Sequence, residues 1–68
     1  MSIRIRLVDG SKKWDVDISG EKTVREVLSM IGLISEEYIV SLNGRIVSPD
    51  EKVRSGDELV LYPVVSGG

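Results

Sequence analysis

Hydrophobic and polar residues alternate along two runs near the start of the chain, 3–8 and 13–18. Successive side chains of a strand point to opposite faces, so this alternation predicts two strands that each have one buried and one solvated face. Asp9-Gly10 lies between the runs and is a turn signal typical of an antiparallel hairpin. Trp14 falls among the hydrophobic positions of the second run, and we therefore expect its side chain to lie in the core.

The hydrophobic period changes after residue 20. Hydrophobic residues recur at positions 24, 27, 28 and 31, which is the spacing of an amphipathic helix. Thr23 and Glu26 have the spacing of a capping box, and Gly32 stands where a helix C-terminus favours glycine. The pattern predicts a helix of about ten residues, which is too short to be stable unless it packs against a sheet.

Three further strands are predicted in the second half of the chain, over 38–42, 45–47 and 58–62. Asn43-Gly44 separates the first two of these strands and is the strongest hairpin signal in the chain. Pro63 is expected to end the last strand, because proline lacks the N–H that a sheet ladder needs. The intervening segments 19–22, 33–37 and 48–51 are expected to be turns and links.

The resulting order of elements, ββαβββ, predicts an α+β fold in which one helix covers one face of a mixed five-stranded sheet. The last strand is most economically placed beside the first, in the middle of the sheet. This is the β-grasp roll of ubiquitin, and we assign residues 1–63 to it. We expect the helix to cover the face that bears Leu59 and Leu61.

Composition narrows the range of functions. The chain has 68 residues, which allows one domain, and its net charge of -2 argues against a nucleic-acid-binding protein. It has no cysteine and no histidine, so we expect neither a disulfide framework nor a metal site. We find no hydrophobic run long enough to cross a membrane and no secretory signal, and we therefore expect a cytoplasmic protein. We also expect a monomer, although no sequence feature determines the oligomeric state.

The sequence also argues against an enzyme. Nucleophilic catalysis needs a nucleophile beside a base, and the chain offers serine and threonine but neither histidine nor cysteine. Adjacent carboxylates occur at 36–37, 50–51 and 57–58, where solvated loop positions are the simplest interpretation. No phosphate-binding loop of the Walker type is present. We therefore expect no catalytic residue and no bound cofactor.

The C-terminal segment 63–68, PVVSGG, carries no charged side chain. Residues 64–68 are expected to form a flexible tail that reaches about 16 Å when it is extended. Gly67 and Gly68 have no Cβ, so their backbone would fit a narrow channel in which a partner enzyme acts on the terminal carboxylate. The alternative is an inert end, because chain termini are often loose without serving a function.

Residues 55–68 contain a Gly-Asp turn, an alternating strand, a proline exit and a terminal Gly-Gly. Together with the Asn43-Gly44 hairpin and the apolar pair Ile46-Val47 after it, this pattern resembles the ubiquitin-like sulfur-carrier family. That family includes ThiS, MoaD and the small archaeal ubiquitin-like modifiers. The chain lacks the aromatic, double-proline exit common in MoaD, and Ser66 stands where eukaryotic ubiquitin has an arginine. The first departure makes the molybdopterin branch less favoured without excluding it, and the second favours an activating enzyme of the bacterial or archaeal sulfur-carrier type.

The resemblance implies a carrier whose Gly68 carboxylate is adenylated by an ATP-dependent activating enzyme and then converted by a sulfur donor to a thiocarboxylate. The partner would use the ATP, and the sulfur would pass to a synthase of thiamin or molybdopterin, or to a tRNA base. In the modifier branch of the family, the activated Gly68 would instead join a lysine amine of a target protein. A third hypothesis is a β-grasp interaction module with an inert tail.

A docking surface is expected on the face of the sheet that the helix leaves uncovered. Val60 and Tyr62 would point to this face, near Val8, and an exposed apolar patch beside a reactive tail often marks a partner site. The alternative is that these are scattered surface residues of an ordinary kind. The candidate docking residues are Val8, Val60, Tyr62, Val64, Val65, Ser66 and Arg45.

Overall fold

The computed structural model describes residues 2–65, and residues 1 and 66–68 lie outside the described part. The strands are β1 (Ser2–Leu7), β2 (Lys13–Asp17), β3 (Lys22–Thr23), β4 (Tyr38–Leu42), β5 (Arg45–Val47), β6 (Lys52–Val53) and β7 (Glu58–Pro63). The α-helix is α1 (Val24–Met30), and a 3₁₀ helix, η1 (Ser35–Glu37), precedes β4. No helix within residues 2–65 is long and apolar enough to cross a membrane.

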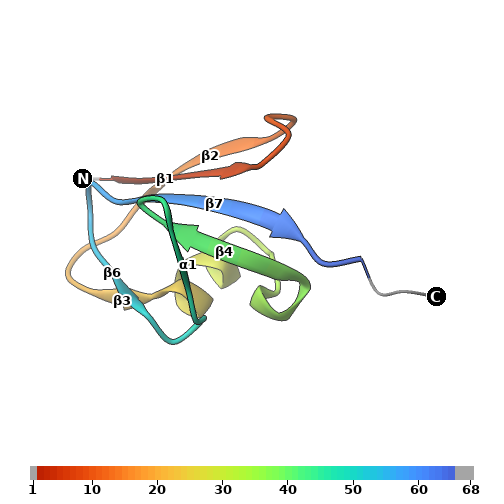
Figure 1. The fold of residues 1–68 in the computed structure, drawn as a ribbon. Coiled ribbons are helices and arrows are strands. Elements are labelled where there is room, and N and C mark those ends of the chain that lie inside the picture. The colour runs from red at the N-terminus through yellow and green to blue at the C-terminus, as the bar shows by residue number, and fades with distance from the viewer. Residues whose placement is uncertain (1, 66–68) are drawn as a thin grey trace.

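The main sheet has five strands in the order β2-β1-β7-β4-β5 (Figure 1). β1 and β7 run parallel to each other, with Arg4 opposite Glu58 and Leu7 opposite Leu61. All other neighbours in this sheet are antiparallel. The last strand therefore lies beside the first in the middle of a mixed sheet, which confirms the predicted β-grasp roll.

Helix α1 begins at the capping box that the sequence predicts. The Thr23 side chain accepts a hydrogen bond from the Glu26 backbone N–H at 3.1 Å, and the Thr23 backbone N–H donates to the Glu26 carboxylate at 2.8 Å. The helix has seven residues and ends at Met30, so it is shorter than the predicted length of about ten. Gly32 then adopts a left-handed conformation (φ 78°), which glycine tolerates without strain, and turns the chain away.

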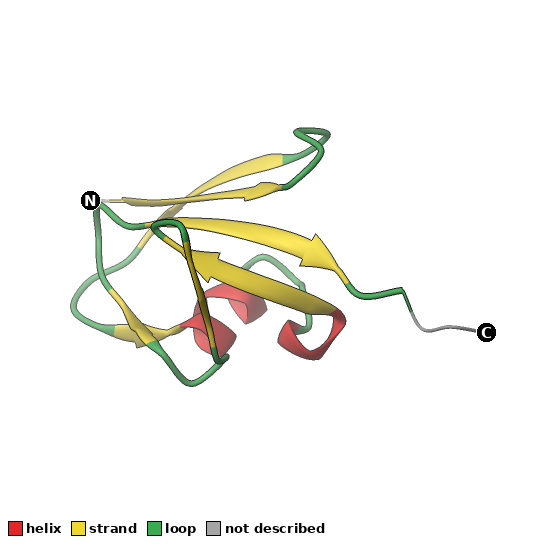
Figure 2. Cartoon of the chain, in the orientation of Figure 1, coloured by secondary structure: helices red, strands yellow, loops and turns green. Residues whose placement is uncertain are grey.

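The helix covers one face of the sheet, as Figure 2 shows. We call this the inner face. Leu59 and Leu61 of β7 are fully buried there, as predicted, and pack in one cluster with residues of the helix. Trp14 is half-buried and packs against the edge of this cluster, which agrees with its predicted inward position.

A second, two-stranded sheet was not predicted. β3 pairs with β6, so that Lys22 lies opposite Val53 and Thr23 opposite Lys52. The chain before β6 also satisfies the helix N-terminus, because the Val24 N–H donates to the Glu51 carbonyl at 2.9 Å. Two-residue strands have no hydrophobic period to detect, so the sequence pattern showed only turns in this region.

The β4–β5 hairpin turns at Asn43 (φ 50°) and Gly44 (φ 90°), as the Asn-Gly signal predicts. Asn43 also connects this hairpin to the start of β7. Its side-chain amide donates to Asp57 at 3.0 Å, and its side-chain oxygen accepts from the Glu58 N–H at 2.9 Å. These two hydrogen bonds therefore join the hairpin to the turn before β7.

Candidate partner-binding site

The candidate site lies on the face of the sheet opposite the helix, which we call the outer face. β7 contributes to both faces, because its side chains alternate. Leu59 and Leu61 are 0% exposed on the inner face, whereas Tyr62 on the outer face is 39% exposed. The same strand thus contributes to the core and to the surface beside the tail.

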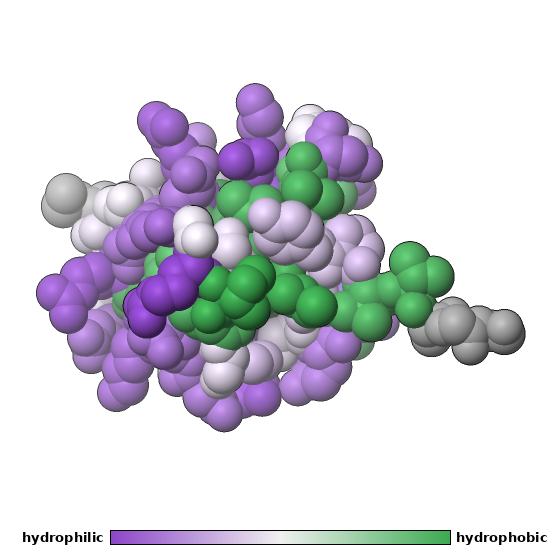
Figure 3. Space-filling view, in the orientation of Figure 1, coloured by the Kyte–Doolittle hydropathy of each residue, from purple (hydrophilic) through white to green (hydrophobic). Residues whose placement is uncertain are grey.

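Hydrophobic side chains of neighbouring strands extend the outer face around Tyr62. Ile39 of β4 is the register partner of Tyr62, and Ile46 of β5 is opposite Ser41 in the middle of β4. Ile46 is 61% exposed, and Ile39 and Val8 are also exposed. We call Val8, Ile39, Ile46 and Tyr62 the apolar patch. Figure 3 shows hydrophobic surface across this side of the molecule that continues onto the base of the tail.

The sequence analysis missed Ile39 and Ile46. A usable signal was present, because the alternation of 38–42 places Val40 and Leu42 on the inner face and therefore Ile39 on the outer face. Ile46 follows in the same way from its position opposite Ser41. These two residues are more exposed than Val60 and Tyr62, the residues of β7 that were predicted for the docking surface.

The predicted exposure of Val60 is wrong. Its side chain points to the outer face, because it alternates with the core residues Leu59 and Leu61, but it is only 8% exposed. β7 is the central strand, and Val60 has a register partner on each side, Arg6 in β1 and Ser41 in β4. Val60 therefore lies beneath the apolar patch, and the exposed residues of the patch cover it.

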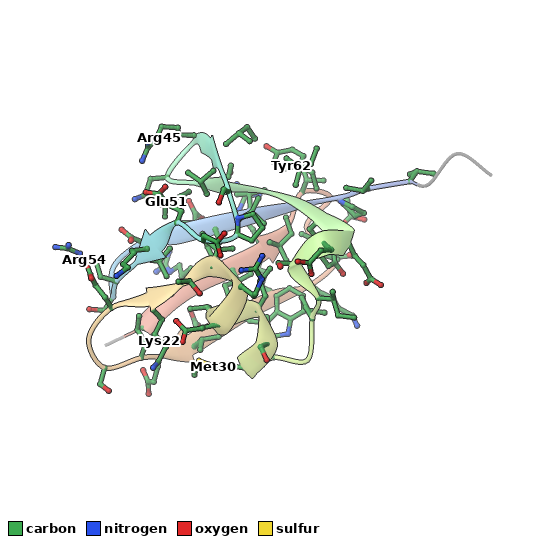
Figure 4. The ribbon with its side chains drawn as sticks, turned by 90° about the horizontal axis from the view of Figure 1, so that it is seen from below. Lys22, Met30, Arg45, Glu51, Arg54 and Tyr62 are labelled. Atoms are coloured by element: carbon green, nitrogen blue, oxygen red, sulfur yellow. The ribbon has the colours of Figure 1, made fainter. Side chains whose placement is uncertain are left out.

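Arg45 is exposed, but it lies on the opposite face from its neighbour Ile46 and the rest of the apolar patch. It pairs with Leu42, a core residue, so the register places Arg45 on the side of the inner face. Figure 4 shows it at the β4–β5 hairpin, well away from Tyr62.

The base of the tail is fixed to the fold one residue beyond the last strand. Pro63 is the register partner of Tyr38, and the Val64 N–H donates to the Glu37 carbonyl at 2.9 Å. Val65, which follows, is 87% exposed. The predicted reactive residues Gly67 and Gly68, and the docking residue Ser66, lie outside the described residues.

Carboxylates flank the tail base. A groove of about 400 Å³ is lined by Glu36, Glu37, Tyr38, Pro63 and Val64. The pKa of Glu36 is lowered, chiefly by the hydrogen bond from its own backbone N–H and also by Arg25, whose guanidinium lies 3.4 Å away. Glu36 is therefore charged at neutral pH beside the exit of the tail.

Within residues 2–65, no group of three or more histidine, cysteine, aspartate or glutamate side chains lies close enough together to hold a metal ion. No buried side-chain nitrogen or oxygen in the same range lacks a hydrogen-bond partner. The described residues supply an exposed apolar surface and the base of the tail.

A β-grasp sheet with an apolar outer face and an exposed tail base defines a ubiquitin-like carrier, and comparison with known proteins supports this class. The sequence matches the ThiS family over residues 5–68. Small archaeal modifier protein 1 from Haloferax volcanii is 32% identical over 76 aligned positions, which cover 90% of this chain and 87% of the relative. The sulfur carrier protein TtuB from Thermus thermophilus is 28% identical over the full length of both chains.

The fold agrees with these relatives. The crystal structure of SAMP1 from Haloferax volcanii matches this structure with a TM-score of 0.74 and 29% identity over 100% of both chains. The chain therefore belongs to the ThiS family of ubiquitin-like sulfur carriers.

Proposed function

We propose that this protein carries sulfur as a thiocarboxylate on Gly68. The main support for the proposal is the family match, which extends through the C-terminal glycines to residue 68. A relative that aligns over the full length of the chain is named as a sulfur carrier protein. The exposed tail base and the adjoining apolar patch supply what such a carrier needs, namely an accessible chain end and a surface for docking.

The proposed chemistry takes place in two steps on the carboxylate of Gly68. In the first step, a carboxylate oxygen attacks the α-phosphorus of ATP, and pyrophosphate leaves. In the second step, hydrosulfide from a sulfur donor attacks the acyl carbon, and AMP leaves with the carboxylate oxygen that it had gained. The product is a thiocarboxylate, whose sulfur then passes to a sulfur-accepting synthase or to a tRNA base.

The catalytic groups for these steps belong to the adenylating enzyme, and ATP is the substrate of that partner. This chain supplies the acyl group. The apolar patch is the docking surface, and docking places the chain end beside the ATP. Burying exposed aromatic and aliphatic side chains is an effective source of binding energy at an interface. The bond between the Val64 N–H and the Glu37 carbonyl sets the point from which the tail extends.

A second function, conjugation to proteins, is favoured by a specific observation. The relative with 32% identity is named as a small archaeal modifier protein. In this branch, the amine of a target lysine attacks the same acyl adenylate, AMP leaves, and an isopeptide bond forms. The two functions share the first step and differ in the nucleophile of the second.

The intact mass of the untagged protein purified from its own host tests the proposal. We expect a fraction whose mass increases by the replacement of one oxygen by sulfur, and the loss of this fraction when Gly68 is deleted. Ladders of conjugates that depend on Gly68 would support the modifier function instead. An unmodified mass without ladders, in the presence of ATP, sulfide and the host's adenylating enzymes, would leave only the interaction module with an inert tail.

The matched control for the deletion is Gly56→Ala. Gly56 is a turn glycine (φ 95°) at the end of the sheet from which β7 starts, so its substitution strains the fold while it leaves the tail intact. The proposal requires that this variant, where it folds, still gains sulfur. Loss of sulfur in both variants would show that the deletion acts through the stability of the fold.

A further inference from the structure

Two positive side chains face each other directly on the outer face of the β1–β2 hairpin. Arg6 of β1 is the register partner of Lys13 of β2, and Arg4 is the next outward-facing residue of β1. Like charges placed directly opposite each other on one face of an antiparallel pair destabilise a sheet. The fold does not need this arrangement, because an opposite charge at either position would stabilise the same hairpin.

Nearby acidic residues compensate for these charges only in part. The Nε of Arg6 lies 3.5 Å from the Glu58 carboxylate, and 42% and 47% of the two side chains are exposed. An exposed pair of this kind contributes little to stability. Among the described residues, neither Arg4 nor Lys13 forms an ion pair, although Arg4 lies between two acidic register partners, Asp15 and Glu58.

These three cations line an open groove next to the apolar patch. The groove has a volume of about 430 Å³ and is bordered by Arg4, Arg6 and Lys13, which we call the basic strip. Arg6 is also the register partner of Val60, which lies beneath the patch. The outer face thus has an apolar part over β7, β4 and β5 and a charged part over β1 and β2, where the basic strip lies beside the carboxylates of Asp15 and Glu58.

We infer that the basic strip binds an acidic surface of the adenylating enzyme, beside the region of that enzyme that contacts the apolar patch. This inference rests on the proposed function and names the chemistry of the partner's surface. Positive charge at the edge of an apolar interface speeds association with an acidic partner and fixes the register of docking. Lys13 in particular remains available for such pairing, because its register partner is Arg6 and no described side chain forms an ion pair with it.

A protein carboxylate fits the basic strip better than a nucleic acid does. Asp15 and Glu58 border the same groove and would repel a phosphate backbone. Individual carboxylates can pair with separate cations and avoid these two acidic residues.

The test compares two charge reversals, Lys13→Glu in the basic strip and Lys52→Glu in β6. Both lysines are exposed, and both substitutions change the net charge equally, but Lys52 belongs to the small second sheet. Association is measured with the host's adenylating enzyme, identified as the enzyme whose ATP–pyrophosphate exchange depends on this chain. Rates are taken by stopped flow at about 0.05 M and 0.5 M salt, because salt screens such interactions.

We expect Lys13→Glu to lower the association rate about tenfold at low salt and to reduce its salt dependence, whereas Lys52→Glu changes the rate by less than about twofold. Thermal unfolding of the same variants supplies a second readout. Lys13→Glu replaces a like-charge pair by an opposite-charge pair, and we expect the melting temperature to rise by about 2–4 °C. Slower association by a more stable protein is a result that a structural role of Lys13 would not produce.

Other results would overturn the inference. Equal slowing by both variants would show a general effect of net charge, and no slowing by either would show that the basic strip does not contact the enzyme. Binding of host tRNA that Lys13→Glu weakens would assign the strip to a nucleic acid. If the wild-type chain supports no exchange with any host adenylating enzyme, the proposed function fails together with the inference. Normal exchange with an unaffected Lys13→Glu variant overturns the inference alone.

Discussion

Both faces of the main sheet carry apolar side chains, but those on the inner face form the core and those on the outer face are exposed. On the inner face, Ile3 and Ile5 of β1, Leu59 and Leu61 of β7 and the aliphatic residues of α1 are almost completely buried and form one core. On the outer face, Ile39, Ile46 and Tyr62 are of the same apolar kind, yet they are at least 39% exposed. Apolar character alone therefore does not tell whether a residue stabilises the fold or offers a binding surface.

The difference arises from what lies above each face. α1 covers the inner face, and water is excluded from it, so each buried aliphatic side chain contributes to stability. No described element covers the outer face, and an apolar patch of this kind is typical of an interaction site. Substitutions on one face should therefore change the free energy of unfolding, and substitutions on the other should change activation by the partner.

The largest expected effect is on the inner face. Leu61→Ala removes a fully buried side chain from the centre of the core and leaves a cavity. We expect the free energy of unfolding to fall by about 2–5 kcal/mol. Urea unfolding measures this change, and a loss below about 1 kcal/mol would show that the core collapses around the cavity or is looser than its burial indicates.

The next effect tests the outer face. Ile46→Ser removes an exposed apolar side chain, and we expect the free energy of unfolding to change by less than about 0.5 kcal/mol. Under the proposed function, kcat/KM for adenylation should fall about tenfold, mainly through KM, because the substitution weakens docking.

Met30→Ser is the matched control for this substitution. Met30 is also exposed and apolar, but it belongs to α1, and Figure 4 shows it on the opposite side of the molecule from Tyr62. We expect adenylation of this variant to match the wild type. Equal losses of kcat/KM in the two variants would contradict a docking role that is confined to the outer face.

A smaller effect is expected where the helix is attached. Thr23→Ala removes the side-chain acceptor of the capping box and should lower the free energy of unfolding by about 1 kcal/mol. The substitution destabilises α1, which covers the inner face, and leaves the residues of the apolar patch unchanged. Adenylation at a temperature at which the variant is folded should therefore be unchanged, and a large change in KM would break the separation between the two faces.

The smallest effect concerns pH. The pKa of Glu26 is lowered, chiefly by the hydrogen bond that the Thr23 backbone N–H donates to its carboxylate. Because the pKa is lower in the folded chain than its ordinary value of 4.5, the contribution to stability is present above that value and is lost as the pH falls through the folded-state pKa. The gap in melting temperature between wild type and Glu26→Ala should therefore be clear at pH 7 and narrow below about pH 4. A gap that persists unchanged to about pH 2 would show that the charge of Glu26 does not contribute.

Strong local signals account for the parts of the fold that were predicted correctly. The Asn43-Gly44 hairpin, the capping box at Thr23 and the alternation of 3–8 each depend on neighbours in the sequence, so a single chain reveals them. β3 and β6 were missed because each pairs with a distant segment over only two residues. Their pairing follows from the fold, which brings the chain around residue 51 back to the helix N-terminus.

The candidate site was predicted less completely than the fold. Tyr62 and Val8 are exposed on the expected surface, but Ile39 and Ile46 were missed, and Val60 proved to be buried. The alternation of a strand shows to which face a residue points. How much of the side chain is exposed depends on the strands on either side, and these come from distant parts of the sequence.

The sequence by itself determined the strands, the capped helix, the Asn-Gly hairpin and the Gly-Gly end, because each depends on residue types at short spacing. Only the tertiary structure decided that Val60 is buried while Ile46 is exposed, and that Arg6 and Lys13 face each other beside the apolar patch. The physical reason is the strand order. Placing β7 between β1 and β4 encloses the central residues of the sheet and leaves the outer face free for a partner.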